Sequence, residues 1–278
     1  MVAAMAGFAI EDMLLKAAAV QLPVGQVMGI FGGGGALIYW ALARRRGEVI
    51  FPRSAFQTTM LVRTMFEILG RLFYTLAIAL TPLSSATAIL QAAPIVVVAG
   101  AAIVFREQVG WRRWSAIAVG LAGVIVILQP GASEFNNLSI LAVLGMLGFA
   151  GRDLATRAAP KALGTNALGV WGFLAILVAG AVFGFYEGAT ISTPDGMTLV
   201  LMAVAVCVGT IAYSALTRAM RTGDVSAVTP FRYTRLVFGV GLGVVFFGET
   251  LDPTTIAGSA VVVVAGLYIL VRGRARNA

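Results

Sequence analysis

The chain has 278 residues, of which 59% are hydrophobic and only 12% are charged, and its formal net charge is +8. Soluble domains carry about 25% charged residues, so this composition predicts an integral membrane protein rather than a soluble protein that binds nucleic acid. The single cysteine, Cys207, excludes an internal disulfide, and the lack of histidine excludes histidine metal ligands and Ser-His-Asp catalysis. We therefore expect no metal site, no cofactor and no enzymatic activity.

Apolar segments of about 20 residues, the length that spans a bilayer, follow one another along the whole chain. Ten segments fit, at residues 2–20, 24–43, 58–80, 83–105, 112–129, 138–158, 165–186, 196–218, 225–247 and 253–271. The sequence therefore predicts an all-α integral membrane protein with ten transmembrane helices, short connections and no soluble domain.

The first predicted helix carries charge at its centre and has no basic start, so it does not resemble a cleavable signal peptide. Glu11 and Asp12 lie there, and the spacing of Asp12 and Lys16 predicts an ion pair on one helix face. The sixth helix repeats this pattern, with a predicted ion pair of Asp153 and Arg157 next to Arg152. Either these pairs only orient two helices, or one of the acids lies on a proton or substrate route.

The third predicted helix carries Arg63, Glu67 and Arg71 at intervals of four residues, followed by Tyr74. This spacing places the three charges on nearly one helix face, where a membrane protein needs a protected polar interior. We expect Arg63 to reach water at the membrane interface. Glu67, Arg71 and Tyr74 are candidates for the wall of a substrate pathway.

The ninth predicted helix carries Arg232, Tyr233 and Arg235 directly after Pro230. A proline at this depth frees a backbone carbonyl and predicts a local break, as in the discontinuous helices around transporter sites. Arg71, Arg232 and Arg235 are then candidates to hold an anionic group, because guanidinium binds carboxylates through two parallel hydrogen bonds. Further candidates for contact with a substrate are Gln91, Trp171 and Tyr213.

The charges expected inside the membrane do not cancel. Five arginines and four acids leave a surplus of one positive charge, which favours an anionic or zwitterionic ligand over an apolar cation. The arginines are Arg63, Arg71, Arg152, Arg232 and Arg235, and the acids are Glu11, Asp12, Glu67 and Asp153.

Lysine and arginine gather in every second predicted loop. With the N-terminus inside, these loops and the C-terminal tail hold fourteen of them, whereas the opposite side holds only Lys16. Basic residues mark cytoplasmic loops, so we expect a bacterial inner-membrane protein with both termini cytoplasmic. Its expected partners are lipid and a small-molecule substrate but not nucleic acid, with the chain acting as a monomer or homodimer.

The two halves of the chain repeat each other. Gly7–Ala18 matches Gly148–Ala159 at an offset of 141, including Asp12 with Asp153, and Glu107 matches Glu249 at an offset of 142. A duplication of five helices places the second copy upside down in the membrane. We therefore expect two inverted repeats, at residues 1–131 and 132–278.

The stretch Thr81–Gly131 and its weaker echo Gly223–Leu270 resemble the two EamA domains of the drug/metabolite transporter superfamily. The most specific features are Pro82 before the fourth helix and the Glu107 and Glu249 that end helices four and nine. The resemblance implies an inner-membrane carrier of small organic solutes that works by alternating access. It implies no particular substrate.

The leading hypothesis is a carrier of an amino acid or organic carboxylate, with either proton coupling or exchange as its transport mode. Alternatives are a larger aromatic or nucleotide-like solute, such as a flavin or nucleoside derivative, and, with less support, a lipid flippase. For Glu107 and Glu249 two interpretations stay open: a gate contact, or a loop acid near the N-terminus of the following helix.

Overall fold

The computed structural model describes residues 1–104, 106, 110–128, 137–157, 163–188, 190–222 and 229–274, and within these ranges it is helical with no strand. In chain order the elements are α1 (Val2–Ala18), α2 (Val24–Arg45), the 3-10 helix η1 (Arg53–Phe56), α3 (Thr58–Leu80), α4 (Leu83–Leu90), α5 (Ala93–Val104), α6 (Trp111–Leu128), α7 (Ser139–Arg157), α8 (Thr165–Glu187), α9 (Gly196–Thr222), the 3-10 helix η2 (Thr229–Tyr233), α11 (Thr234–Phe247) and α12 (Pro253–Arg274).

Several helices have the length and apolar composition of membrane spans. Over the described ranges five stretches qualify, and they correspond to α2, α4 with α5, α7, α8 and α9, while shorter apolar stretches lie in α6 and α12. The buried charges of α3 and the 17-residue length of α1 set these two helices apart. The expected multi-pass, all-helical membrane protein is thus confirmed.

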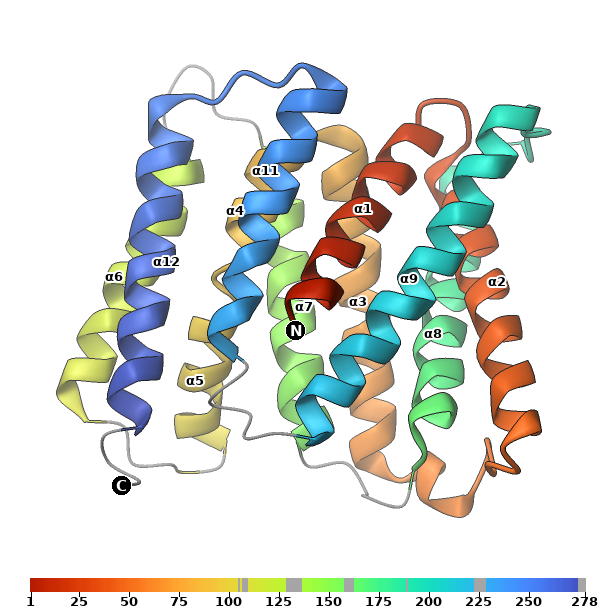
Figure 1. Ribbon diagram of the computed structural model, residues 1–278, viewed down its shortest axis with the longest axis horizontal. Helices are drawn as coiled ribbons and strands as arrows, with labels where there is room; N and C mark the ends of the chain where they lie inside the picture. The colour runs from red at the N-terminus through yellow and green to blue at the C-terminus, as the bar shows by residue number, and fades with distance from the viewer. Residues whose placement is uncertain are drawn as a thin grey trace.

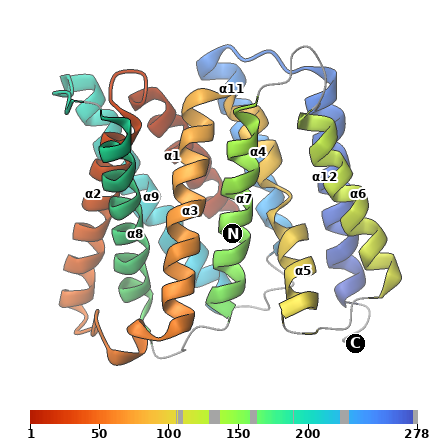
Figure 2. The same cartoon turned by 180° about the vertical axis from the view of Figure 1, so that it is seen from behind.

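The helices run along a common direction and pack in pairs that join the two halves of the chain (Figures 1 and 2). α2 packs on α8, α3 on α7, α1 on α9, α4 on α11, and α6 on α12. Since every one of these pairs takes one helix from each half, the core of the protein is the interface between the halves.

Small residues let α2 and α8 approach closely, as the glycine-rich run Gly32–Gly35 suggests. A Cβ atom added to Gly32 would lie only 2.4 Å from the backbone nitrogen of Leu177. At one end of this pair the Glu48 carboxylate accepts hydrogen bonds from the backbone N–H groups of Asn166 and Ala167, at 3.1 and 3.2 Å. A glutamate that follows α2 thus caps α8, which fixes the register of the pair.

The fourth predicted span is not one continuous helix. α4 ends at Leu90, and α5 begins at Ala93 after a turn at Gln91. Pro94 explains the break, because it has no N–H to offer the carbonyl of Leu90 and its ring excludes that carbonyl from α-helical geometry. In the ninth span, Pro230 lies in η2, so the expected departure from an α-helix is confirmed there.

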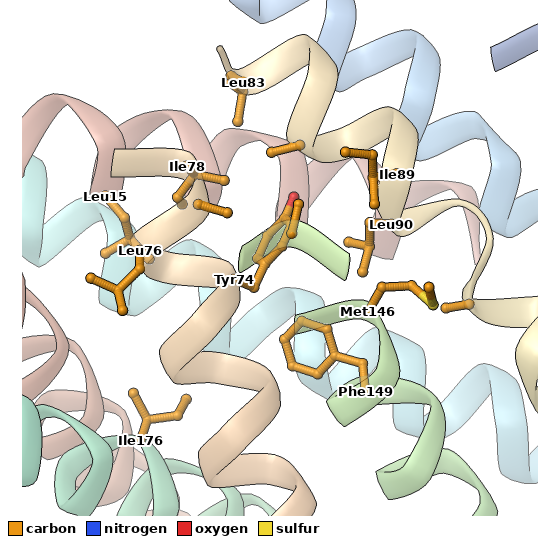
Figure 3. Close-up of a cluster of buried hydrophobic side chains, with 14 of the residues drawn as sticks. Leu15, Tyr74, Leu76, Ile78, Leu83, Ile89, Leu90, Met146, Phe149 and Ile176 are labelled. Carbon is orange, nitrogen blue, oxygen red and sulfur yellow. The ribbon is translucent and has the colours of Figure 1, made fainter. Parts of the chain in front are cut away.

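Apolar side chains from both halves fill the centre. Figure 3 shows Tyr74 on α3 close to Leu90 of α4 and to Phe149 of α7. The Tyr74 and Phe149 rings meet edge to face with their centroids 5.8 Å apart. This packing holds the broken α4–α5 segment against α3 and α7, next to the buried charges.

Candidate functional site

A cavity lies where the two interrupted spans meet, and the α4–α5 break is about midway between the two ends of the bundle (Figure 1). Its lining residues come from α1, α3, the α4–α5 break, α7, α9, η2 and α11. They are Met5, Phe8, Arg71, Leu90, Gln91, Ala93, Pro94, Phe149, Arg152, Tyr213, Leu216, Arg232 and Arg235. Among the residues that the structure describes, the lining thus contains four guanidinium groups and no carboxylate.

The first group of charges joins α1 to α3 and α11. Arg71 donates to Glu11 at 2.7 Å, and Arg235 donates to Asp12 at 2.5 Å. Tyr74 adds a longer hydrogen bond to Asp12, at 3.3 Å. Glu11 and Asp12 are 1% and 0% exposed, so these acids lie behind the arginines that face the cavity.

The predicted Asp12–Lys16 pair is wrong. The Lys16 ammonium instead donates to the backbone carbonyls of Ile78 and Thr81, at 3.0 and 2.5 Å, where α3 ends. The reason is tertiary, because α11 brings Arg235 to Asp12 while the open end of α3 supplies carbonyl acceptors for the ammonium group.

The second group of charges joins α3 to α7 and η2. Glu67 accepts from Arg63 at 3.2 Å and from Arg152 at 3.1 Å. Asp153 accepts from Arg152 at 2.8 Å and from Arg232 at 3.0 Å. Arg152 therefore bridges the two acids and links them into one chain of ion pairs.

Arg63 does not reach water as expected. It is 3% exposed and donates to Thr156 and Tyr213, each at 3.0 Å, as well as to Glu67. Thr156 belongs to α7 and Tyr213 to α9, so residues of these two helices hold the guanidinium inside the protein. The side chain of Arg157 lies outside the described residues, and so does its predicted pair with Asp153.

Aromatic rings cover the guanidinium faces of Arg71, Arg152 and Arg235. The Arg235 guanidinium lies 5.2 Å from the Phe8 ring centroid and 5.5 Å from that of Tyr74. Arg152 lies 4.9 Å from the ring centroid of Phe149. Cation–π contacts of this kind hold the planes of the guanidinium groups and leave their N–H edges for carboxylates.

Some of the predicted substrate contacts lie elsewhere. Trp171 donates to the backbone carbonyl of Ile50 and packs edge to face on Phe51 and Phe56, away from the cavity. Tyr74 and Tyr233 are buried at 0% and 6% exposure, outside the cavity lining. Of the predicted residues, the cavity brings together Arg71, Gln91, Arg152, Tyr213, Arg232 and Arg235.

Sequence reasoning missed the apolar part of the lining. Phe8 and Phe149 occupy matching positions of the two repeats, and this equivalence was the available signal. The proline within the apolar segment 83–105, Pro94, was the signal for the helix break that exposes Gln91 to the cavity.

Glu249, just after the end of α11, joins the two halves away from the cavity. Its carboxylate accepts from the backbone N–H groups of Leu83 and Ser84, at 2.6 and 2.9 Å, and from the Ser84 hydroxyl at 2.7 Å. The Lys16 ammonium is 3.8 Å away. Glu249 therefore caps α4 of the other half rather than the helix that follows it in sequence, while Glu107 lies outside the described residues.

Comparison with known proteins gives one family and several relatives. The profile of the EamA-like transporter family matches residues 1–129 and 137–272. The riboflavin transporter of Rhizobium johnstonii is 29% identical over 76% of this chain and 69% of its own. The S-adenosylmethionine uptake transporter of Rickettsia prowazekii is 25% identical over 80% and 76%. The pseudopaline exporter CntI of Pseudomonas aeruginosa is 27% identical over 93% and 90%.

One solved crystal structure also superposes on the chain, with a TM-score of 0.64 and 19% identity over 96% of both chains. A likeness at this identity supports the fold alone. The three relatives are all named as transporters, but of different solutes. The S-adenosylmethionine relative is named for uptake and the pseudopaline relative for export.

Proposed function

Since the chain belongs to the EamA-like transporter family, we propose that it is a secondary carrier of a carboxylate-bearing metabolite, such as an amino acid or organic acid. The observation that carries the proposal is the cavity between the halves, where four arginines line the wall and their carboxylate partners lie behind them. Guanidinium edges aimed at a polar cavity suit an anionic solute.

In this proposal the chain forms ten spans in two inverted units, residues 1–131 and 132–278. The helix pairing supports it, because exchanging the halves maps the α3–α7 contact onto α9–α1, and α2–α8 and α6–α12 onto themselves. The caps support it too, since Glu48 after α2 caps α8, and Glu187 at the end of α8 accepts from Gly25 of α2 at 3.4 Å. Rocking of one unit against the other would alternately expose the cavity.

We also propose that the end of the bundle with the C-terminal end of α12 faces the cytoplasm. This end carries Arg44 and Arg45 of α2, Arg53 of η1 and Arg112 of α6. The opposite end carries the acid that ends α8, the acid that follows α11, and the acids that precede α9 and α12. These acids are Glu187, Asp195, Glu249 and Asp252. The asymmetry follows the positive-inside rule.

Each acid behind the cavity has a role in the proposed cycle. Glu11, Asp12, Glu67 and Asp153 neutralise the arginines when the cavity is empty, and Glu67 or Asp153 takes a coupling proton when an anionic solute draws its arginine away. The coupling predicts that solute flux responds to an imposed pH gradient.

The test is uptake of radiolabelled amino acids and organic acids into proteoliposomes, with and without a pH gradient. Arg71→Ala is expected to abolish uptake while expression is retained. Arg44→Ala is the matched control, because Arg44 lies outside the cavity over the Trp40 ring. Normal uptake by Arg71→Ala would overturn the role of Arg71 in the cavity.

A second candidate is a carrier of a larger aromatic or nucleotide-like solute. The rings of Phe8, Phe149 and Tyr213 in the cavity lining favour it, as do the relatives named for riboflavin and S-adenosylmethionine. Thermal-shift measurements with amino acids, organic acids, nucleotides and flavins separate the two candidates. Stabilisation by flavins or nucleotides alone would replace the first proposal with the second.

A further inference from the structure

The two groups of charges around the cavity differ in their net charge. The first contains Arg71 with Glu11 and Arg235 with Asp12, and its charges cancel. The second contains the side chains of Arg63, Arg152 and Arg232 with Glu67 and Asp153. Counted over these described side chains, the surplus positive charge of the core belongs to the second group alone.

Two of the three arginines in the second group face the cavity. Arg63 is 3% exposed and is held by Glu67, Thr156 and Tyr213, so it offers little to a ligand. Arg152 and Arg232 both line the cavity. The Arg232 side chain is 18% exposed, and its one carboxylate contact among the described residues is with Asp153, which it shares with Arg152.

A largely buried charge without a carboxylate of its own is costly, because it loses hydration that no ion pair compensates. The first group has no such need, since each of its arginines has an acid of its own. We propose that a singly charged anionic group binds in the cavity against Arg152 and Arg232, while Arg71 and Arg235 stay paired with Glu11 and Asp12.

This inference rests on the proposed function and makes it more specific. The anionic group is the carboxylate of the transported solute, and a small inorganic anion occupies the same place when the solute is absent. Arg71 and Arg235 then act as positioning residues that hold α1 against α3 and α11, with their guanidinium faces covered by aromatic rings.

The experiment measures the thermal unfolding of the purified full chain while acetate or chloride replaces a bulky sulfonate buffer anion at constant ionic strength. A saturable upward shift is expected with acetate in the wild type and in Arg235→Gln, and its loss is expected in Arg232→Gln. The two substitutions remove the same chemistry three residues apart, from the charged group and the neutral group respectively. Arg71→Gln, also in the neutral group, serves as the control if Arg235→Gln does not fold.

A second measurement is made without small anions. Arg232→Gln removes the surplus charge and is expected to keep or raise the unfolding temperature, whereas Arg235→Gln leaves Asp12 without its arginine and is expected to lower it. No shift with acetate, a shift that persists in Arg232→Gln, or an equal loss in the control variant would overturn the inference. An additional response to chloride supports the shared anion site, and a response to chloride without one to acetate overturns a carboxylate site.

The anion site and the proposed carrier function can fail independently of each other. An acetate shift that depends on Arg232, in a protein whose proteoliposomes take up no carboxylate, would keep the site and reject the carrier role. Carboxylate uptake together with an unchanged shift in Arg232→Gln would keep the carrier and reject this site.

Discussion

Glu249→Gln tests the contact that joins α11 to the start of α4. The carboxylate accepts three hydrogen bonds from Leu83 and Ser84 at 2.6 to 2.9 Å, and its side chain is 9% exposed. Hydrogen bonds to a charged group contribute about 1.5–3 kcal/mol each, and a negative charge at a helix N-terminus adds about 0.3–1 kcal/mol. Gln keeps one oxygen but replaces the other with a donor that faces N–H groups, so we expect a loss of about 2–3 kcal/mol.

The assay is equilibrium unfolding in mixed micelles, with Glu187→Gln as the matched control. Glu187, like Glu249, is next to a left-handed glycine at the end of a helix, here Gly188, but it is exposed and accepts a long hydrogen bond from Gly25 at 3.4 Å. We expect its substitution to cost less than about 0.5 kcal/mol, as for most surface changes. If the two variants differ by less than about 1 kcal/mol, the cap does not stabilise the contact in the way the geometry indicates.

Two further predictions concern the helix packing and one loop. Gly32→Ala is expected to destabilise the protein by about 1–3 kcal/mol, because its Cβ would meet the Leu177 backbone at 2.4 Å. Gly29→Ala, whose Cβ has nothing within 4 Å, is expected to be neutral or stabilising, and an equal loss in both variants would contradict this. The Thr198 N–H, 2.7 Å from Asp195, lowers the pKa of that carboxyl. The stabilisation by Asp195 is therefore complete above its unfolded pKa of about 3.9 and is lost as the pH falls through the lower folded value. The difference in stability between wild type and Asp195→Ala should therefore be largest near pH 7 and shrink as the pH falls below about 3.9, and a difference that does not change with pH would refute the role of this hydrogen bond.

The charges in the core give the clearest comparison between sequence and structure. The sequence indicated which residues would be buried together, because Arg71, Arg152, Arg232 and Arg235 occur in apolar segments where charge is costly. Spacing along one helix, however, predicted local partners, and the pair of Asp12 with Lys16 was wrong. Local spacing gives the neighbours on one helix, whereas the partners in a packed bundle come from helices far away in the chain.

The fourth span and the aromatic candidates show the same difference. The length and composition of residues 83–105 indicated a membrane span, but Pro94 divides it into α4 and α5, and the resulting turn brings Gln91 to the cavity. Trp171 looked equivalent to other aromatic residues in the sequence. Only its packing against Phe51 and Phe56 separates it from the cavity.

Composition, segment length and local motifs were enough to show that this protein lies in a membrane, that it is helical and which family it belongs to. Which arginine pairs with which acid, and therefore where the surplus charge lies, could be seen only in the packed structure. Tertiary structure also decided that Arg63 is buried and that Glu249 caps α4. These features depend on distances between helices of opposite halves, and such distances follow from packing rather than from the order of residues.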